Sequence, residues 1–405
     1  MSIYKDRQYY KFCFYGFLKN LRFFEAFLIL FLRQKGLSYT EIGSLYALRE
    51  VVTNLAEVPT GIIADTYGRK KSLIFSFVAY ILSFLLFFAG ENYLWFLAAF
   101  LLYGLGDAFR SGTHKAMIMD YLKLKGISEQ KIAYYGHTRA CSQRGSALSA
   151  LISGIIVFYT GDYQTIFLLS VLPYLIDMLL IWSYPAELDR GKRKHKNSIA
   201  GSLRELWQAL HSPAVWRILH SAAVFTAYQK AVKDYIQPVM KQVALSLPFL
   251  LAYQADKRTG LMMGLMYFVL YLLTSRASQM SGKLASYISD IPYKSLIVGF
   301  GAGILAGYFF QLNYAWVALL AFTIIYIIEN LRKPVLTGYL SDNVPNEILA
   351  SVLSVQSLYR TLLTSVLSLV FGYLADLWGL GYALTAVSAF LLLLSVLTGR
   401  KSAGR

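Results

Sequence analysis

The sequence GIIADTYGRKKSL, from Gly61 to Leu73, places one acidic and three consecutive basic residues between two apolar runs. The run that follows, SLIFSFVAYILSFLLFFA, extends from Ser72 to Ala89 without a charged residue. About 18 or more such residues are enough to cross the apolar part of a lipid bilayer as a helix. The charged sequence is therefore predicted to be a short loop between two membrane-spanning helices.

Similar apolar runs recur along the whole chain of 405 residues, of which 57% are hydrophobic and 15% charged. An ordinary soluble chain has roughly 45–50% apolar and about 25% charged residues. Because lipid accepts only helices and closed barrels as spanning structures, the runs predict an all-α membrane protein. We expect twelve spanning helices, at about residues 10–32, 41–64, 72–90, 93–121, 133–159, 163–184, 215–243, 258–282, 293–311, 314–340, 347–375 and 378–399.

Basic residues are concentrated in alternate predicted loops. The outer loops hold only Arg33, Lys35, Lys257 and Arg258, whereas the inner segments hold clusters such as Arg69 to Lys71 and Arg190 to Lys196. This asymmetry is the positive-inside pattern, and it predicts that both termini are cytoplasmic in a multi-pass protein of the bacterial inner membrane. It also accounts for the formal net charge of +17 without a nucleic-acid partner.

The longest polar connection, PAELDRGKRKHKNSIAGSLREL (Pro185–Leu206), divides the predicted spans into two groups of six. We therefore expect an N-terminal bundle at residues 1–184, a cytoplasmic linker at 185–214 and a C-terminal bundle at 215–405. The sequence GIIADTYGRKKSL has a degraded counterpart, GKLASYISDIPYKSL, after the second span of the other half. Such corresponding signals predict two pseudo-symmetric six-helix bundles, an organisation found in many secondary transporters.

Six residues of the opening loop resemble the signature loop between spans 2 and 3 of the major facilitator superfamily: Gly61, Asp65, Gly68, Arg69, Lys70 and Lys71. The sequences EVPTG (Glu57–Gly61) and NLRFFE (Asn20–Glu25) resemble its drug-efflux-like bacterial branch. The resemblance covers essentially the whole chain and implies alternating access, with this loop as a cytoplasmic gating latch and with spans 1, 4, 7 and 10 around a central pathway. Ser286 replaces the acid in the second half, and GYLADLWG (Gly372–Gly379) is expected in an outer loop, so neither implies a second latch.

Ionisable residues interrupt the apolar segments on these same spans. Asp107, Arg110, His114 and Lys115 share an arc of about 140° on one helical face. A charge in the bilayer interior costs at least ~2.5 kcal/mol, so such groups normally face a bundle interior or a water-filled cavity. We predict that the substrate pathway is lined by Arg22, Glu25, Asp107, Arg110, His114, Lys115, His137, Arg144, Lys230, Lys233, Asp234, Gln237, Glu329, Arg332 and Arg360.

Lysine and arginine outnumber aspartate and glutamate in this set, which favours an anionic or zwitterionic small molecule as the substrate. The 31 tyrosines and 26 phenylalanines would suit an amphiphilic one. Proton coupling requires a group whose proton affinity changes as the pathway opens and closes. The candidate groups are Glu25, Glu50, Asp107 and Asp234.

The sequence contains no phosphate-binding loop with its Lys and Ser/Thr, so ATP is not expected to drive transport directly. The closely spaced glycines of GFGAGILAG (Gly299–Gly307) lie inside a span and predict close helix packing. We expect no cofactor, no metal site and no enzymatic activity, because no constellation of nucleophile, base and acid emerges.

The sequence therefore predicts a monomeric secondary transporter that lies in the lipid bilayer and exports a small organic solute in exchange for protons. Three alternatives remain open at this stage. They are uptake or exchange of an anionic metabolite through the same fold, a lipid flippase, and a membrane sensor that does not transport.

Overall fold

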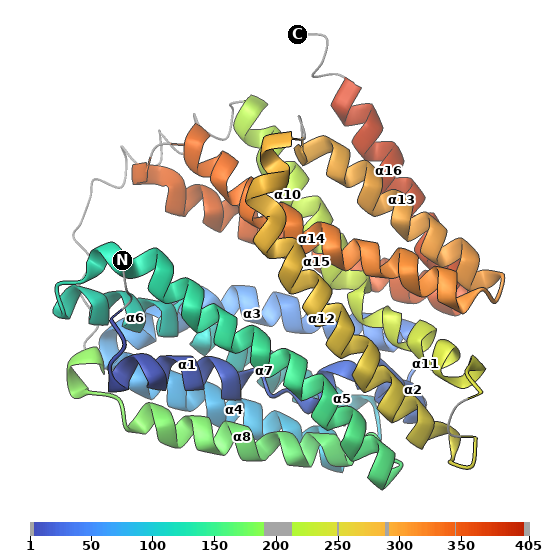
Figure 1. Ribbon diagram of the computed structural model, residues 1–405, viewed down its shortest axis with the longest axis horizontal. Coiled ribbons are helices and arrows are strands. Elements are labelled where there is room, and N and C mark those ends of the chain that lie inside the picture. Colours follow the sequence, from blue (N-terminus) through green and yellow to red (C-terminus); the bar gives the residue numbers. More distant parts are fainter. Residues whose placement is uncertain (1–3, 190–212, 249–250, 288–290, 345, 401–405) are drawn as a thin grey trace. The chain divides into compact units, whose positions relative to one another are not determined.

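The computed structural model of the chain describes residues 4–189, 213–248, 251–287, 291–344 and 346–400 (Figure 1). Every regular element within these ranges is a helix, which confirms the all-α prediction for this part of the chain. The chain forms two compact units. Unit 1 consists of Met1–Leu37, Leu48–Lys194 and Pro248–Tyr271, and unit 2 of Ser38–Ala47, His195–Leu247 and Leu272–Arg405.

Eight helices of the described residues are long and apolar enough to cross a membrane. They correspond to eight of the twelve predicted spans and make the chain a multi-pass membrane protein. These helices are α4 (Arg69–Ala89), α7 (Lys131–Thr160), α8 (Thr165–Trp182), α12 (Ala255–Tyr287), α13 (Ile291–Gln311), α14 (Ala315–Asn343), α15 (Asn346–Trp378) and α16 (Leu380–Arg400).

Three other predicted spans were expected to be continuous helices, and this expectation is wrong. Residues 10–32 form α1 (Arg7–Lys19), the 3₁₀ turn η1 (Phe23–Ala26) and α2 (Leu28–Gln34). Residues 93–121 form α5 (Tyr93–Arg110) and α6 (Thr113–Leu124). Residues 215–243 form α10 (Pro213–Val232), the turn η4 (Lys233–Tyr235) and α11 (Ile236–Ser246).

The remaining predicted span, at 41–64, is the continuous helix α3 (Tyr39–Tyr67), which carries acidic residues along its length. Two short 3₁₀ turns, η2 (Ser128–Gln130) and η3 (Ala186–Asp189), complete the described elements.

The break between α5 and α6 shows why these segments are interrupted. Gly112 has a φ of 71°, a left-handed conformation that only glycine adopts at little cost. The Ser111 amide still donates to the carbonyl oxygens of Asp107 and Ala108, and the Thr113 hydroxyl donates to that of Phe109. The freed backbone groups are thus satisfied locally. Irregular backbone at membrane depth is tolerated where it is buried in protein or lines a water-filled cavity. Gly112 at this break lines a polar cavity.

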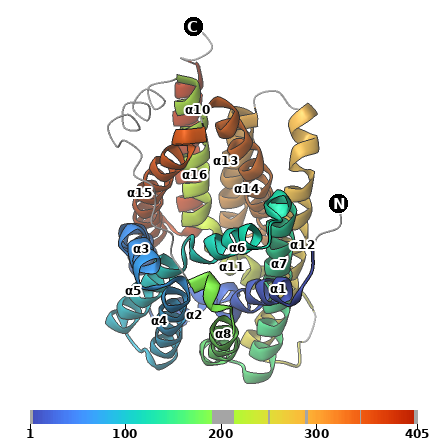
Figure 2. The ribbon, with the colours of Figure 1, turned by 90° about the vertical axis from the view of Figure 1, so that its left-hand side faces the viewer.

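In unit 1, α4 and α8 lie side by side (Figures 1 and 2), and together with η1 they contribute an aromatic core. The ring centroids of Phe24 and Phe167 lie 5.4 Å apart, and those of Phe87 and Phe167 lie 4.8 Å apart. All three rings are buried, and each such pair contributes about 0.5–1.5 kcal/mol beyond the area that it buries. This packing fixes the helices that carry the polar residues described below.

In unit 2, glycines allow α13 to lie very close to α10 and α16. A Cβ atom on Gly299 would collide with the ring of Phe225, and one on Gly307 would collide with the backbone of Gly381. The sequence GFGAGILAG therefore serves helix packing, as predicted.

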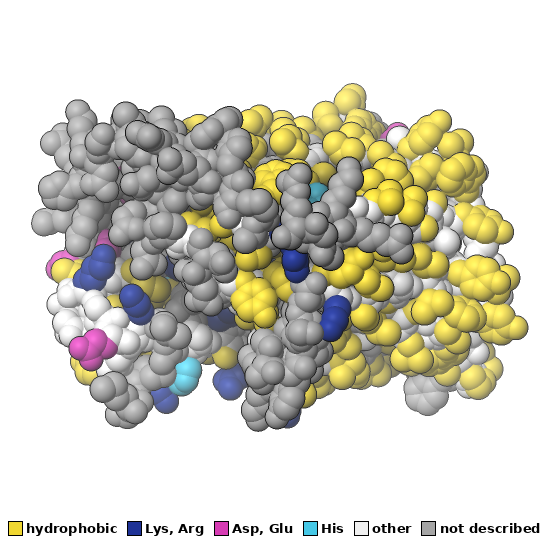
Figure 3. All heavy atoms as spheres, turned by 90° about the horizontal axis from the view of Figure 1, so that it is seen from above, with side chains coloured by type: hydrophobic (Ala, Val, Ile, Leu, Met, Phe, Trp, Pro, Cys, Tyr) yellow, Lys and Arg dark blue, Asp and Glu magenta, His cyan; other side chains and the backbone are white. Residues whose placement is uncertain are grey.

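Large apolar side chains remain exposed on the spanning helices. Leu179 of α8 is 63% exposed and Leu320 of α14 is 68% exposed, and hydrophobic side chains cover much of the face in Figure 3. A surface of this kind is stable when lipid tails cover it.

Asp376, in the last turn of α15, caps the first turn of α3 within unit 2. Its carboxylate accepts hydrogen bonds from the backbone amides of Tyr39 at 2.9 Å and Thr40 at 2.7 Å, and from the Thr40 hydroxyl at 2.6 Å. A carboxylate at a helix N-terminus is also favoured by the helix dipole. The sequence GYLADLWG was expected in an outer loop, but all of it except Gly379 belongs to α15.

We predict that Asp376→Ala lowers the stability of the protein, because three donors of α3 lose their acceptor. The loss of a helix cap is expected to cost about 0.5–2 kcal/mol. The apparent melting temperature of detergent-purified protein measures the effect. Glu129→Gln, which removes a charge from the exposed turn η2, is the control. Equal melting temperatures of the two variants would contradict the capping role.

Candidate functional site

A polar cavity of about 340 Å³ lies between α1, α6 and α7 in unit 1. Four cationic side chains line it, whereas the residues described around it include no Asp or Glu. The cavity therefore has a positive potential that attracts anions. The cationic residues are Lys19, Arg110, Lys115 and Arg139.

Arg110 is held at the cavity by a network with Tyr80 and Asp107. The Tyr80 hydroxyl donates to Asp107 Oδ1 at 2.6 Å, and Arg110 Nε donates to the Tyr80 oxygen at 3.1 Å. Arg110 Nη2 also lies 3.5 Å from Asp107 Oδ1. Since Tyr80 is fully buried, the network has little freedom to move. Asp107 therefore positions Arg110 and does not itself line the cavity.

Two further ion pairs lie next to this network and share Tyr103. Arg22 Nη2 lies 3.0 Å from Glu25 Oε2, and Arg22 Nη1 donates to the Tyr103 hydroxyl at 3.4 Å. Arg49 Nη2 lies 3.5 Å from Glu50 Oε1, and the Arg49 guanidinium lies 5.7 Å from the Tyr103 ring centroid. The Tyr103 and Tyr80 rings are 5.0 Å apart. The structure thus brings the predicted residues of spans 1, 2 and 4 into one polar cluster.

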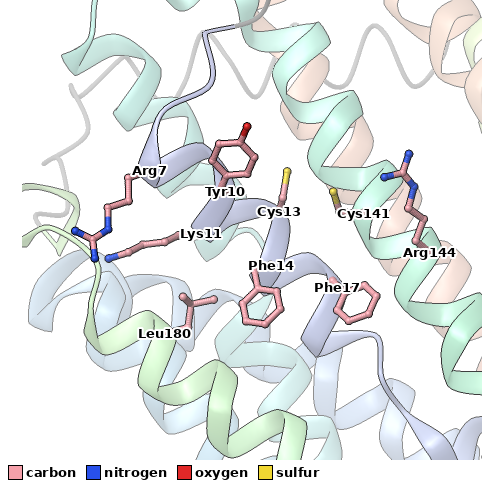
Figure 4. Close-up of a pocket in the computed structure, with 9 residues that line it drawn as sticks. All are labelled: Arg7, Tyr10, Lys11, Cys13, Phe14, Phe17, Cys141, Arg144 and Leu180. Atoms are coloured by element: carbon pink, nitrogen blue, oxygen red, sulfur yellow. The ribbon is translucent and has the colours of Figure 1, made fainter. Parts of the chain in front are cut away.

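His114 also lines the cavity and is enclosed by aromatic side chains. Its ring stacks on Tyr15 with the centroids 3.6 Å apart, and its Nε2 lies 3.2 Å from the Tyr184 hydroxyl. The structure places two other predicted residues away from the cavity. His137 is exposed and bonds through Nδ1 to the Tyr9 hydroxyl at 2.9 Å, and Arg144 lies in a separate groove beside α1 (Figure 4).

Asp177 of α8 is a buried acid that the sequence reasoning missed. It is 0% exposed, and within the described residues neither of its carboxyl oxygens has a hydrogen-bond partner. Lys19 lines the cavity and is itself 8% exposed. Its positive charge interacts electrostatically with the Asp177 carboxylate. The signal was present in the sequence, because Asp177 is the only acid in TIFLLSVLPYLIDMLLIW (Thr165–Trp182).

Unit 2 contains its own polar cavity, of about 290 Å³, between α10, α14 and α15. Arg332 is 1% exposed. Its Nη2 donates to the backbone oxygen of Ser221 at 2.9 Å and to the Ser221 hydroxyl oxygen at 2.7 Å. Its guanidinium also lies 4.7 Å from the Phe225 ring centroid.

Other polar residues of this cavity have partners of their own. Arg360 Nη2 donates to Ser357 Oγ at 2.8 Å, and Glu329 accepts from the Thr226 hydroxyl at 2.9 Å. Lys333 and Gln356 complete the polar lining.

The two arginines of this cavity keep unused donors. Arg332 Nε and Nη1 and Arg360 Nε are buried and have no hydrogen-bond partner among the described residues. Buried polar groups are almost always satisfied in native proteins, so these donors indicate a missing acceptor. A carboxylate or phosphate group matches the paired donors of a guanidinium.

The remaining predicted residues of unit 2 lie at the break between α10 and α11. Lys233 Nζ lies 3.5 Å from Asp234 Oδ1, and Asp234 Oδ2 accepts from the Tyr46 hydroxyl at 2.9 Å. Gln237 is fully buried in the first turn of α11. Neither these residues nor Lys230 line the unit 2 cavity, so their positions fit a structural role at the break.

Three aspartates form ion pairs or hydrogen bonds with the loop between α3 and α4 and with the first turn of α4. Arg69 Nη1 lies 2.5 Å from Asp120 Oδ2, and Arg69 Nη2 lies 3.5 Å from Asp65 Oδ1. Asp189, far away in the sequence, accepts a hydrogen bond from the Lys70 amide at 2.7 Å. Asp189 therefore caps α4, whereas Asp65 pairs with a base.

The glycines of this loop differ in their surroundings. Gly68 has a φ of 111°, and a side chain on it would collide with the Asp189 carboxylate. Gly61 has no neighbouring atom within 4 Å of the Cβ position, so it makes no close helix contact among the described residues. The Lys71 side chain is exposed.

The model of the Major Facilitator Superfamily matches residues 13–366 of the chain. The chain belongs to the Major Facilitator Superfamily. It is 23% identical over 385 residues to the uncharacterized MFS-type transporter YxaM of Bacillus subtilis (strain 168), covering 91% of this chain and 89% of the relative. The family and this relative identify the chain as a transporter and not an enzyme.

Solved structures share the fold of this superfamily member at low sequence identity. A POT family transporter in complex with a thioalcohol conjugated peptide is similar with a TM-score of 0.73 at 13% identity, covering 98% of this chain and 96% of that one. The nucleoside transporter NupG is similar with a TM-score of 0.74 at 10% identity, covering 96% of this chain and 98% of that one. A bacterial homolog of the human lysosomal transporter Spinster gives 0.71 at 14% identity, with 96% of both chains covered.

We predict that Gly68→Ala destabilises the superfamily loop by about 1–3 kcal/mol, because the left-handed backbone and the Asp189 carboxylate both oppose a side chain. Gly61→Ala meets neither a left-handed backbone nor a neighbouring atom. Gly36→Ala meets only the cost of a left-handed backbone, because Gly36 has a φ of 87° and no atom within 4 Å of its Cβ position. Melting temperatures of the three purified variants should therefore rank Gly61→Ala highest and Gly68→Ala lowest. A Gly68→Ala variant as stable as Gly61→Ala would refute the role of the Asp189 contact.

Proposed function

We propose that the chain exports a small anionic or zwitterionic, amphiphilic organic solute in exchange for protons, by alternating access. The observation that carries this proposal is the cationic lining of both cavities, and above all the unused guanidinium donors of Arg332 and Arg360. A solute with a carboxylate or phosphate group supplies the acceptors that these donors lack.

The cavity volumes support a small acidic group as the part of the solute that each unit binds. Drug-sized ligands fill sites of about 300–1,000 Å³. The cavity of about 340 Å³ is at the lower end of that range, and the cavity of about 290 Å³ lies just below it. We infer that Lys19 and Arg110 in unit 1, and Arg332 and Arg360 in unit 2, discriminate acidic solutes from neutral ones.

We further infer twelve spans in two pseudo-symmetric bundles, at residues 1–184 and 215–405, joined by the linker at 185–214. Most of that linker, residues 190–212, lies outside the described residues. Support comes from the breaks in the first, fourth and seventh predicted spans, because interrupted helices at the pathway are typical of secondary transporters. The proposal includes cytoplasmic termini, a bacterial inner membrane and a monomer.

We propose that Asp177, together with Lys19, carries the coupling proton. The four acids expected from the sequence already have partners: Glu25 with Arg22, Glu50 with Arg49, Asp107 with Arg110, and Asp234 with Lys233. Asp177 has no hydrogen-bond partner among the described residues, and Lys19 connects it with the polar cavity. An acid beside a base in a desolvated site changes its proton affinity whenever the base engages another anion.

Several other groups act on this pair and must be considered with it. The charge of Asp177 acts electrostatically on Tyr15 of α1 and on Tyr184 after α8. The charge of Lys19 is influenced by four neighbouring ionisable groups, Arg110, Arg22, Asp107 and Glu25. A solute carboxylate that binds Lys19 and Arg110 would draw the ammonium group away from Asp177. This competition would make solute binding and proton binding at Asp177 mutually dependent.

We predict that acidic amphiphiles raise the melting temperature of the purified protein, whereas their neutral amide analogues do not, because a ligand of the native state stabilises it. Arg360→Gln and Arg110→Gln should weaken the response at least tenfold in ligand concentration. Arg69→Gln, which breaks the ion pairs with Asp65 and Asp120 and lines neither cavity, should keep it. Equal responses to acid and amide, or equal losses in all three variants, would overturn the proposed site.

Proton coupling is tested in liposomes with the acidic solute that gives the largest thermal shift. We predict that an imposed pH gradient drives transport by the wild type at least tenfold faster than by Asp177→Asn. Exchange of labelled for unlabelled solute, which needs no net proton movement, should continue in that variant. Unchanged gradient-driven transport in Asp177→Asn would remove Asp177 from the coupling step.

The direction of transport distinguishes export from uptake. An inward proton gradient drives solute out of the vesicle in antiport and into the vesicle in symport. Accumulation along with the protons would replace export by uptake of an anionic metabolite. Movement of labelled phospholipid between leaflets, without transport of a soluble acid, would instead identify a flippase. If neither the phospholipid nor the acid moves, the membrane sensor is the alternative that remains.

A further inference from the structure

An open groove of about 660 Å³ lies over α1 in unit 1, bounded by α7 and α8 (Figure 4). It lies on the face of α1 opposite to the polar cavity. Tyr10, Phe14 and Phe17 line the groove, while Phe12, Tyr15 and Lys19 line the polar cavity. At 100° per residue, the two sets are separated by about half a turn. The groove is therefore distinct from the proposed solute site.

The floor of the groove is apolar and open. Tyr10 is 60% exposed and Phe14 is 47% exposed, and the rings of Phe14 and Phe17 are nearly parallel with their centroids 6.3 Å apart. Leu180 of α8 extends the floor to one side. In a membrane protein, exposed aromatic and aliphatic side chains of this kind contact lipid.

Basic side chains lie along both sides of this apolar floor. Arg7 and Lys11 lie on the side of α8, and Arg144 projects from α7 on the other side (Figure 4). Within the described residues, neither Arg7 nor Arg144 forms an ion pair. A cation on a lipid-facing surface is costly unless an anion neutralises it, so the groove favours a negatively charged occupant.

The end of α8 fixes part of this basic boundary. Lys11 Nζ donates to the Ser183 carbonyl at 2.6 Å, and Lys70 Nζ donates to the carbonyls of Trp182 at 2.8 Å and Tyr184 at 2.9 Å. The C-terminus of a helix favours cations, so these carbonyls hold two ammonium groups beside the groove. The positive charge at this end is therefore set by the fold.

We propose that the groove binds an anionic phospholipid of the surrounding membrane. Arg7 and Lys11 bind its phosphate, Arg144 neutralises the acidic headgroup from the side of α7, and the acyl chains cover Phe14, Phe17 and Leu180. Basic pockets between spanning helices bind acidic headgroups in this way. A phospholipid supplies both the anion and the apolar chains, whereas a free anion leaves the aromatic floor exposed.

The test uses the full chain, purified in a neutral detergent and depleted of lipid. Phosphatidylglycerol and phosphatidylcholine with identical acyl chains are added, and melting temperature and lipid retention in native mass spectrometry are measured. We expect phosphatidylglycerol to stabilise the protein and to be retained at a concentration at least fivefold lower than phosphatidylcholine. Equal effects of the two lipids would overturn the proposal.

Variants locate the binding to the groove. Arg7→Gln combined with Lys11→Gln, and separately Arg144→Gln, should each remove most of the preference for phosphatidylglycerol. Arg7→Lys and Arg144→Lys, which keep the charge, should retain it. Lys123→Gln, which removes an exposed base on α6, should also leave it unchanged.

Two further outcomes would contradict the assignment. If glycerol phosphate alone reproduces the full stabilisation, the groove binds a soluble anion and the acyl chains contribute nothing. If the glutamine variants melt at the wild-type temperature in phosphatidylcholine yet keep the preference for phosphatidylglycerol, the lipid binds elsewhere. The acidic-solute response of these variants is measured in parallel, so a failure of the lipid site is separable from a failure of the solute site.

Discussion

The charged side chains inside the apolar bundles require partners, and this requirement organises the rest of the structure. Arg22–Glu25 and Asp107–Arg110 are three residues apart, while Arg49–Glu50 and Lys233–Asp234 are adjacent in sequence. Each pair therefore belongs to one segment and reduces the charge of that segment before any tertiary contact forms. Such local pairing lowers the cost of placing each segment in lipid.

Local pairing leaves a second class of groups whose partners are missing or distant. Arg332, Arg360 and Asp177 keep buried polar atoms without hydrogen bonds among the described residues, although a satisfied network would be more stable. Proteins retain such departures from the stable arrangement mainly where function requires them. The locally paired groups hold the helices and their breaks, and the incompletely paired groups are the ones available to a solute or a proton.

The sequence predicted the features that depend on local composition and failed on those that depend on distant neighbours. Apolar runs identified the eight helices that are long and apolar enough to span a membrane, and a helical wheel correctly placed Asp107 and Arg110 on one face. A wheel gives directions around one helix axis and does not say which neighbour each direction meets. The sequence reasoning therefore placed Arg144 on the pathway, whereas Arg139 of the same helix lines the polar cavity and Arg144 lines the groove. Asp189 caps α4 across more than a hundred residues, and only the folded chain shows that Asp177 lacks donors.

Within unit 1, helix α1 connects the polar cavity and the groove. It is 13 residues long, ends at Lys19, and is followed by the break that holds Arg22. One face carries Lys19 toward the polar cavity, and the other carries Arg7, Lys11 and Phe14 toward the groove. A short rigid helix cannot move one face without the other. An occupant of the groove that favours one position of α1 therefore also biases the position of Lys19, and its influence on solute binding is limited by its difference in affinity for the two positions.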